Sequence, residues 1–264
     1  MSDELSPPST PTDACKDGFN PEYFDRLADL EQGHFWFVSR NRLIVWAIRK
    51  YFPDMRDYLE LGCGTGFVLA AVRRAFGDAA LSGCDLYPEG VDWTRRRVPG
   101  AEVAQMDVRT LSDEGRFDVV GAYDLMEHIP EDGMVLSRIH RALKKDGILV
   151  MTVPQHRFLW GPFDEASCHC RRYTESMLRE RVETAGFEIL RMTSFVSLLL
   201  PLMSAARLME KRRPAREYDL IESLKPNSVA NAVFSRILDA ERLLIRMGVS
   251  PPAGGSLLAV AKKK

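Results

Sequence analysis

Segments with strand-like and helix-like patterns alternate along residues 57–193, and this alternation constrains the fold more than any other feature. Strands that alternate with helices form βαβ units, in which successive strands pair in parallel. We therefore predict an α/β fold: a doubly wound, mostly parallel seven-stranded sheet, Rossmann-like, with helices on both faces. The expected strands are 57–61, 80–85, 102–106, 117–123, 147–153, 187–193 and 256–260, and the expected helices between them are 67–76, 90–97, 131–143 and 174–185.

The regions outside this alternation differ in pattern. Residues 1–18 are rich in Ser, Pro, Thr and Asp and show no periodicity, which predicts a disordered tail. Residues 19–264 are predicted to form a single domain that opens with cap helices in 20–51. Two amphipathic stretches, 198–209 and 228–247, predict a helical insertion over about 197–250, before the last strand.

Charge and cysteine usage exclude several classes of protein. The chain carries 36 Lys and Arg against 37 Asp and Glu, so it has no overall attraction to nucleic acid. Five scattered cysteines argue against a disulfide framework and fit a reducing compartment. Cys168-His169-Cys170 has neither the spacing nor the second pair typical of zinc sites, so we expect no metal.

The apolar segments are too short to cross a membrane. The first residues lack the basic and apolar regions of a secretion signal. The longest apolar stretch, Phe195 to Ala206, is much shorter than the roughly 20 residues that span a bilayer. The expected location is therefore the cytoplasm.

A glycine-rich loop, Glu60-Leu-Gly62-Cys-Gly64-Thr-Gly66, lies between a predicted strand and a predicted helix. Glycines at such a place let the backbone turn sharply and approach a ligand closely. The spacing differs from the G-x-G-x-x-G of dinucleotide-binding loops, and no Gly-Lys-Ser/Thr of a phosphate-binding loop follows. The Glu60 carboxylate would repel a pyrophosphate, whereas it suits a ligand that carries an ammonium group.

These residues resemble the first motif of the class I S-adenosylmethionine-dependent methyltransferases, of the type 11 and 12 kind. Asp85 ends the next strand nineteen residues after Gly66, and Asp107 follows the third strand. The segment Tyr123-Asp-Leu-Met-Glu-His-Ile-Pro130 resembles the family's post-motif region, and Leu-Lys-Lys-Asp-Gly147 resembles its turn before the fifth strand. The resemblance covers about residues 34–194 and the last strand.

The resemblance implies S-adenosyl-L-methionine as the cofactor. Asp85 would accept hydrogen bonds from the ribose hydroxyls, and Asp107 would lie at the adenine. Arg42 lies at an offset similar to that of an arginine in ubiquinone-pathway O-methyltransferases, where it would clamp the methionine carboxylate. The predicted cofactor-binding residues are Arg42, Glu60, Gly62, Gly64, Gly66, Asp85, Leu86, Asp107, Val108, Tyr123, Asp124 and Leu125.

Methyl transfer from a sulfonium requires a nucleophile held in line and a route for its proton. His128 and His169 are the two candidate bases, because histidine titrates near neutral pH. Aromatic and charged residues after the fifth strand suit a small, partly apolar acceptor; their alternative role is to pair with one another in the loop. The predicted acceptor-binding residues are Trp36, His156, Trp160, Asp164, Arg172 and Tyr173.

We therefore expect an enzyme that methylates an oxygen, or secondarily a nitrogen, of a small-molecule or lipid-linked acceptor. Residues 198–213 combine apolar and basic side chains, which permits either peripheral contact with a membrane or a helical lid or homodimer contact. A non-catalytic cofactor-binding paralogue is the main alternative. Glycine spacing disfavours an oxidoreductase, and neutral charge with no N-P-P-Y motif disfavours action on nucleic acid or protein.

Overall fold

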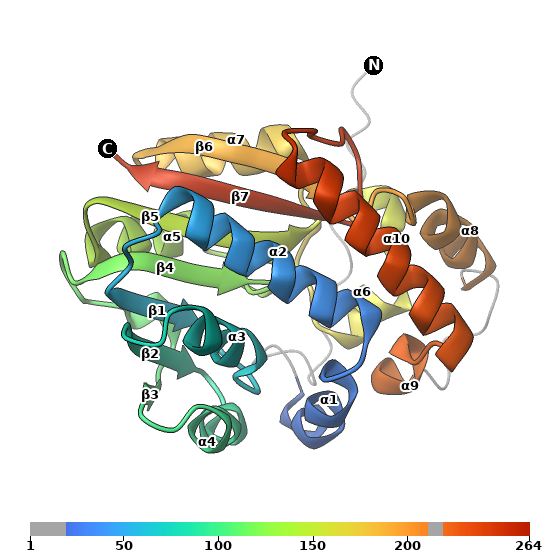
Figure 1. The fold of residues 1–264 in the computed structure, drawn as a ribbon, viewed down its shortest axis with the longest axis horizontal. Coiled ribbons are helices and arrows are strands. Elements are labelled where there is room, and N and C mark those ends of the chain that lie inside the picture. The colour runs from blue at the N-terminus through green and yellow to red at the C-terminus, as the bar shows by residue number, and fades with distance from the viewer. Residues whose placement is uncertain (1–19, 211–218) are drawn as a thin grey trace.

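A seven-stranded sheet forms the centre of the protein in the computed structural model, which describes residues 20–210 and 219–264 (Figure 1). The strand order is β3-β2-β1-β4-β5-β7-β6. Neighbours pair in parallel except β7, which is antiparallel to both β5 and β6. The predicted fold class is confirmed. The strands are β1 Asp57–Leu61, β2 Ala80–Asp85, β3 Glu102–Gln105, β4 Phe117–Tyr123, β5 Leu143–Pro154, β6 Phe187–Phe195 and β7 Ser256–Lys263.

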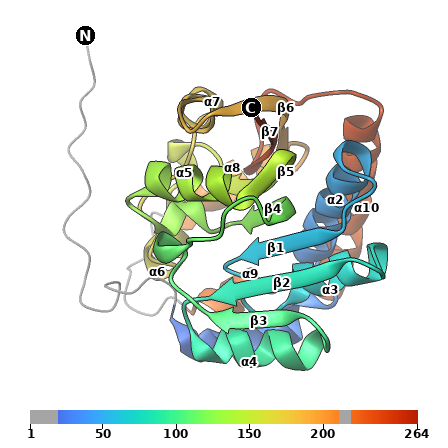
Figure 2. The same ribbon diagram turned by 90° about the vertical axis from the view of Figure 1, so that its left-hand side faces the viewer.

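Helices cover both faces of the sheet. Helices α5 and α7 lie on one face, and α2, α3 and α10 lie on the other (Figure 2). All seven residues of β4 are buried, as expected for a central strand that is covered on both sides. The helices are α1 Phe24–Glu31, α2 Phe35–Tyr51, α3 Phe67–Ala75, α4 Pro88–Arg97, α5 Asp132–Ala142, α6 Pro162–Ala166, α7 Glu175–Thr184, α8 Leu200–Glu210, α9 Leu220–Leu224 and α10 Ser228–Arg246.

Predicted and observed elements agree closely where the periodicity is strong. Helix α2 starts with His34 as its N-cap, and the predicted strands 57–61, 80–85 and 117–123 are reproduced residue for residue. Strand β5 starts four residues earlier than predicted, because Leu143 already pairs with Phe117 before the register shift in β4. The predicted tail 1–18 lies outside the described residues.

The insertion between β6 and β7 consists of α8, α9 and α10, of which α10 packs along α2 (Figure 1). In the described ranges 20–210 and 219–264, no helix has both the length and the apolar character needed to cross a membrane.

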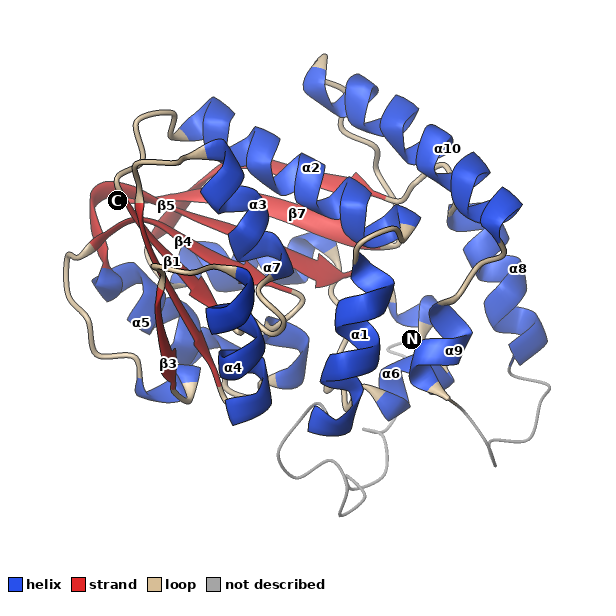
Figure 3. Ribbon diagram, turned by 60° about the horizontal axis from the view of Figure 1, so that its bottom comes forward, coloured by secondary structure: helices blue, strands red, loops and turns tan. Residues whose placement is uncertain are grey.

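Parallel register brings the carboxyl ends of four strands to one edge of the sheet. Leu61 lies beside Cys84, and Tyr123 lies beside Thr152, so the segments that follow these strands start close together. Helix α1 lies near this edge, between α4 and α9 (Figure 3). Ligands of open α/β sheets bind at the carboxyl ends of the strands, which makes this edge the place to look for a site.

Candidate active site

The backbone of the glycine loop adopts a conformation that side chains disfavour. Gly62, Gly64 and Gly66 have φ angles of +64°, +53° and +74°. A Cβ at Gly66 would lie 3.0 Å from the Cα of Thr94, and one at Gly62 would lie 2.8 Å from a methyl carbon of Leu125. Glycine is therefore required at Gly66 by backbone angle and by space, and at Gly62 by backbone angle, since the flexible Leu125 side chain can move aside.

The Asp85 carboxylate is bound to the same loop. It accepts hydrogen bonds from the Gly64 N–H at 2.8 Å and from the Tyr87 N–H at 3.0 Å. Burial raises the pKa of Asp85, and the backbone N–H groups of Tyr87, Gly64 and Leu86 oppose that rise. A carboxylate has about four acceptor positions, so Asp85 keeps capacity for ligand hydroxyls.

Helix α1 closes over the glycine loop. A ring carbon of Phe24 lies 3.8 Å from where a Cβ of Gly64 would be. At the other end of the helix, buried Glu31 accepts hydrogen bonds from Thr65 Oγ1 at 2.5 Å and from Arg97 at 2.8 Å. The place of α1 at the site was not predicted, because a short amphipathic helix carries no local sign of where it packs.

Glu60 lies buried beneath the loop. Its Oε2 accepts a hydrogen bond from the Tyr58 hydroxyl at 3.3 Å, and that hydroxyl lies 3.2 Å from the one of Tyr123. Burial raises the pKa of Glu60 to about 8, although the charge of Arg40 opposes the rise. From this position Glu60 can orient the glycine loop, which the burial of its carboxyl group favours over direct contact with a ligand.

The arginine at the site differs from the one that the sequence analysis chose. Arg42 is half-exposed and pairs with Asp239 of α10 at 2.9 Å, so the structure does not bring it to the glycine loop. Arg40 is buried, pairs with Asp124 at the end of β4, and lies 4.6 Å above the Trp36 ring. Two residues along a helix are about 200° apart, which explains why only one of these arginines faces inward.

A signal for Arg40 was present in the sequence. Residues 37, 40, 44 and 47 follow one another at steps of three or four, and all four are buried. An arginine on the apolar face of a helix needs a buried partner. The prediction of Arg42 was based instead on its distance in sequence from the glycine loop, which is similar to that of an arginine in related enzymes.

The remaining predicted cofactor-binding residues lie along the same edge. Asp107 caps a short 3-10 helix, Val108–Thr110, and its pKa is lowered, first by the hydrogen bond from Arg109. Leu86, next to Asp85, is partly exposed, whereas Val108 is buried. Leu125 packs against Gly62. Apart from Arg42, the predicted set is gathered around the ends of β1 to β4.

In the loop after β5, residues 155–173, Asp164 organises the local structure. Asp164 is fully buried and accepts hydrogen bonds from the Gly161 N–H at 2.9 Å and from Arg172 Nε at 2.7 Å. His169 Nδ1 lies 2.8 Å from the oxygen that Arg172 contacts. Burial acts to raise the pKa of Asp164, but His169 and Arg172 bring it below its usual value.

The predicted acceptor-binding residues therefore divide into two groups. Asp164 and Arg172 bind each other, and the buried Tyr173 hydroxyl donates to Asp132 at 2.7 Å, so these three stabilise the loop. Trp36, His156 and Trp160 are half-buried. His156 has a φ of 63°, and its ring stacks on Phe158 at 5.1 Å.

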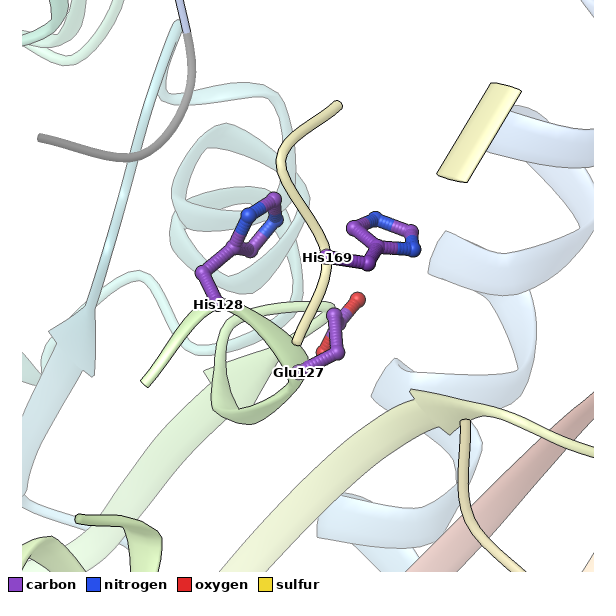
Figure 4. Close-up of side chains that lie close together, drawn as sticks. All are labelled: Glu127, His128 and His169. Carbon is purple, nitrogen blue, oxygen red and sulfur yellow. The ribbon is translucent and has the colours of Figure 1, made fainter. Parts of the chain in front are cut away.

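Glu127, His128 and His169 form a cluster, called the 127/128/169 cluster below (Figure 4). The two imidazole rings meet edge to face with centroids 4.8 Å apart. Burial, followed by the charge of His169, lowers the pKa of His128 to about 3, so its ring is neutral at pH 7. Burial, followed by the charge of Asp124, raises the pKa of Glu127.

His169 has the better geometry of the two predicted bases. Asp164 holds its Nδ1, as a carboxylate holds the histidine in many hydrolases, and leaves Nε2 available to take a proton. His128 has no such partner at Nδ1, which is buried without a hydrogen bond to any residue that the structure describes. The structure brings both histidines together, although they are 41 residues apart in sequence.

The strand order, the glycine loop and the acid at the end of β2 define a Rossmann-like methyltransferase fold. A family model described as "Methyltransferase domain" matches residues 30–192. The chain therefore belongs to the methyltransferase domain family, and this region is an S-adenosylmethionine-dependent methyltransferase domain.

Curated relatives agree with this assignment. A probable S-adenosylmethionine-dependent methyltransferase of Mycolicibacterium smegmatis is 27% identical over 170 residues, which are 62% of this chain and 63% of that protein. A trans-aconitate 2-methyltransferase of Methylobacterium nodulans is 31% identical over 98 residues, 37% of this chain and 38% of that protein. The chain thus spans less than two thirds of the length of either relative.

Solved structures share the fold at low identity. A TehB-like S-adenosylmethionine-dependent methyltransferase of Corynebacterium glutamicum superposes with a TM-score of 0.54 at 19% identity, covering 93% of this chain and 100% of that one. The [4+2]-cyclase SpnF superposes with a TM-score of 0.55 at 20% identity, covering 84% and 81%. These two similarities support the fold alone.

Proposed function

We propose that this protein transfers the methyl group of S-adenosylmethionine to an oxygen atom of a small acceptor. One observation carries the proposal: the glycine loop bound to Asp85 and a histidine oriented by Asp164 lie at the same edge of the sheet. The glycine loop with Asp85 suits a nucleoside that carries an amino-acid tail, and His169 with Asp164 suits removal of a proton. A nitrogen acceptor is the second choice, because a neutral amine needs no base before it attacks.

The residues present fit the cofactor. Asp85 has acceptor positions for two ribose hydroxyls, and Asp107 lies one strand further along for the adenine. The absence of side chains at Gly62 and Gly64 leaves room for the methionine part to approach the backbone of the loop, and Leu125 packs beside Gly62. Arg40, paired with Asp124, takes the place at this edge that the sequence analysis gave to Arg42.

The bound cofactor supplies an electrophilic methyl group on a sulfonium, so the protein has two tasks. Positioning the acceptor in line contributes roughly 7–11 kcal/mol. His169 Nε2 takes the proton of the acceptor hydroxyl while Asp164 stabilises the imidazolium that forms, a contribution of about 10²–10⁴ in rate.

The surroundings favour a small acceptor with an apolar part. Trp36, His156 and Trp160 offer half-buried aromatic surface near the strand ends. The relative named trans-aconitate 2-methyltransferase provides a precedent for a small acceptor. A lipid-linked acceptor stays a prediction: Leu202, Leu208 and Met209 of α8 are exposed, and residues 211–213 of the predicted 198–213 contact lie outside the described residues.

Calorimetric titration with S-adenosylmethionine, S-adenosylhomocysteine and NADH tests the cofactor. We expect micromolar binding of the first two and no heat with NADH. Binding of NADH alone would overturn the argument from the glycine loop. A screen with methyl-labelled cofactor then tests the acceptor, starting with hydroxylated small acids and phenols.

A paralogue that binds the cofactor without transferring its methyl group is the second candidate, favoured by one observation: the cyclase SpnF shares the fold under an activity name other than methyl transfer. His169→Ala separates the two. A methyltransferase with His169 as base loses at least 100-fold in turnover while its affinity for S-adenosylmethionine stays the same. His140→Ala is the matched control, because His140 lies on α5 outside the site. Cofactor binding with no transfer to any acceptor would favour the paralogue.

A further inference from the structure

We propose that Glu127, His128 and His169 bind one divalent first-row transition-metal ion, with Zn²⁺ best matched to the donors, and leave one coordination position open. Two imidazoles and one carboxylate are the donor set of many catalytic zinc sites. Mg²⁺ prefers oxygen ligands alone and fits this set poorly. The sequence analysis expected no metal ion, because it considered only the Cys168-His169-Cys170 motif.

The donor atoms lie close enough for one ion. One donor atom of each residue lies within 4.8 Å of those of the other two. Ligands of a tetrahedral Zn²⁺ at about 2.1 Å from the ion are roughly 3.4 Å apart, so modest side-chain rotations complete the set. Two segments supply the donors: the turn after β4 carries Glu127 and His128, and the 155–173 loop carries His169 (Figure 4).

Glu127 has a buried carboxyl group with one oxygen left unpaired among the described residues. The residue is 1% exposed, and its Oε2 makes no hydrogen bond among the described residues. The nearby arginines are engaged elsewhere, since Arg40 pairs with Asp124 and Arg172 pairs with Asp164. A buried acceptor without a donor is costly, and a cation at this point would satisfy it.

The two histidines present lone pairs in the manner of metal ligands. Arg172 donates to the Asp164 oxygen that lies 2.8 Å from His169 Nδ1, so Asp164 is an ionised acceptor and Nδ1 carries the proton. That leaves the lone pair on Nε2, the arrangement that a carboxylate imposes on many metal-binding histidines. Within the described part of the chain, His128 Nδ1 is buried without a hydrogen-bond partner, while backbone groups of Ser167 and Cys168 engage the ring.

Binding of the ion does not depend on the proposed function, but its use does. With the ion bound, His169 Nε2 gives its lone pair to the metal and no longer takes a proton. An acceptor hydroxyl at the open position has its pKa lowered by the ion, and its proton passes to solvent. The oxyanion then forms the C–O bond as the C–S bond of the sulfonium breaks, leaving a neutral thioether.

Titration of the metal-free full chain with Zn²⁺ tests the site. We expect one equivalent to bind with micromolar or tighter affinity and Mg²⁺ to give no comparable heat. Co²⁺ should bind with the visible absorption of a low-coordinate ion. His128→Asn and His169→Asn should each weaken Zn²⁺ binding at least tenfold, with thermal melting used to verify that each variant folds.

Two matched control variants test whether side chains outside the cluster bind the metal ion. His140→Asn removes a histidine far from the cluster, and Cys170→Ser removes an exposed free thiol next to it; neither should change the affinity. Absence of Zn²⁺ binding by the wild type, or its loss in Cys170→Ser, would overturn the site. So would binding that persists in both folded cluster variants.

Titration of the same preparation with S-adenosylmethionine separates the two proposals. Zn²⁺ binding without cofactor binding would refute the proposed function and leave the metal site. Methyl transfer that continues undiminished after removal of the ion by a chelator would overturn its catalytic use.

Discussion

The glycine loop after β1 and the 155–173 loop after β5 lie at the same edge of the sheet, but different groups hold them in place. Around the glycine loop, backbone N–H groups bind the Asp85 carboxylate, and left-handed glycines set the path of the chain. Around the 155–173 loop, side chains bind side chains: Asp164 contacts Arg172 and His169. The proposed cofactor side therefore depends on backbone geometry, and the proposed acceptor side depends on buried ion pairs.

We expect the two loops to differ in how well they tolerate substitutions. A backbone cradle recognises a ligand without depending on particular side chains, which suits a cofactor that stays the same across a family. A loop held by a few buried charges can change shape when those residues change, which suits an acceptor that varies. Four predictions test this comparison, from the largest expected effect to the smallest.

Glu60→Gln should remove a pH dependence that originates on the cofactor side. The pKa of Glu60 is about 8 in the folded protein, against about 4.5 for an unperturbed glutamate. Between these two pH values, Glu60 keeps its proton in the folded state and has lost it in the unfolded chain. The stability that the protonated Glu60 contributes is therefore complete below about pH 4.5 and is lost as the pH rises through about 8. The expected loss is roughly 5 kcal/mol in the wild type.

Urea unfolding at several pH values between those limits measures this slope. The glutamine variant should have a smaller slope than the wild type, because Asp85 and Glu127, whose pKa values burial also raises, still contribute to it; the exposed Glu114→Gln should keep the full slope. An unchanged slope in Glu60→Gln would place the titrating group elsewhere.

Arg40→Ala should destabilise the protein by about 3–5 kcal/mol, because it leaves the half-buried Asp124 without its partner. Arg42→Ala is the matched control on the same helix. Its pair with Asp239 is exposed and contributes about 0–1 kcal/mol. Denaturant unfolding compares the two. Equal losses would contradict the assignment of Arg40 as the inward arginine.

Asp85→Ala should weaken binding of S-adenosylmethionine roughly 10- to 100-fold, because each hydrogen bond to a charged group contributes about 1.5–3 kcal/mol. Asp113→Ala removes an aspartate that pairs only with Arg116 among the described residues, and it should bind normally. Calorimetry reports both affinities. An unaltered dissociation constant in Asp85→Ala would exclude its role at the ribose.

Phe24→Ala should speed dissociation of the cofactor about 2- to 10-fold, since an aromatic contact contributes roughly 0.5–1.5 kcal/mol. The ring lies against Gly64 and Gly90 on the cofactor side. Phe158→Ala removes an exposed ring on the acceptor side and should leave dissociation unchanged. Stopped-flow fluorescence measures the rates. A larger effect of Phe158 than of Phe24 would reverse the assignment of the two sides.

The sequence by itself determined the α/β class, the strands β1, β2 and β4, and the glycine loop with Asp85. These features depend on periodicity and on spacing within a few tens of residues, and both can be read from the sequence. The same local information placed Asp107 and the segment from Tyr123 at strand ends. Local sequence information could not decide whether Asp164 and Arg172 contact a ligand or pair with each other, because the same residue types suit both roles.

Tertiary structure alone decided which groups from distant segments meet. Packing of α2 on the sheet turned Arg40 inward and left Arg42 beside Asp239. The path of the 155–173 loop brought His169 to Glu127 and His128, and α1 came to lie over the glycine loop. Such contacts form because the buried apolar faces of helices and strands fix the orientation of every side chain they carry. That orientation is a property of the packed whole, so no local pattern specifies it.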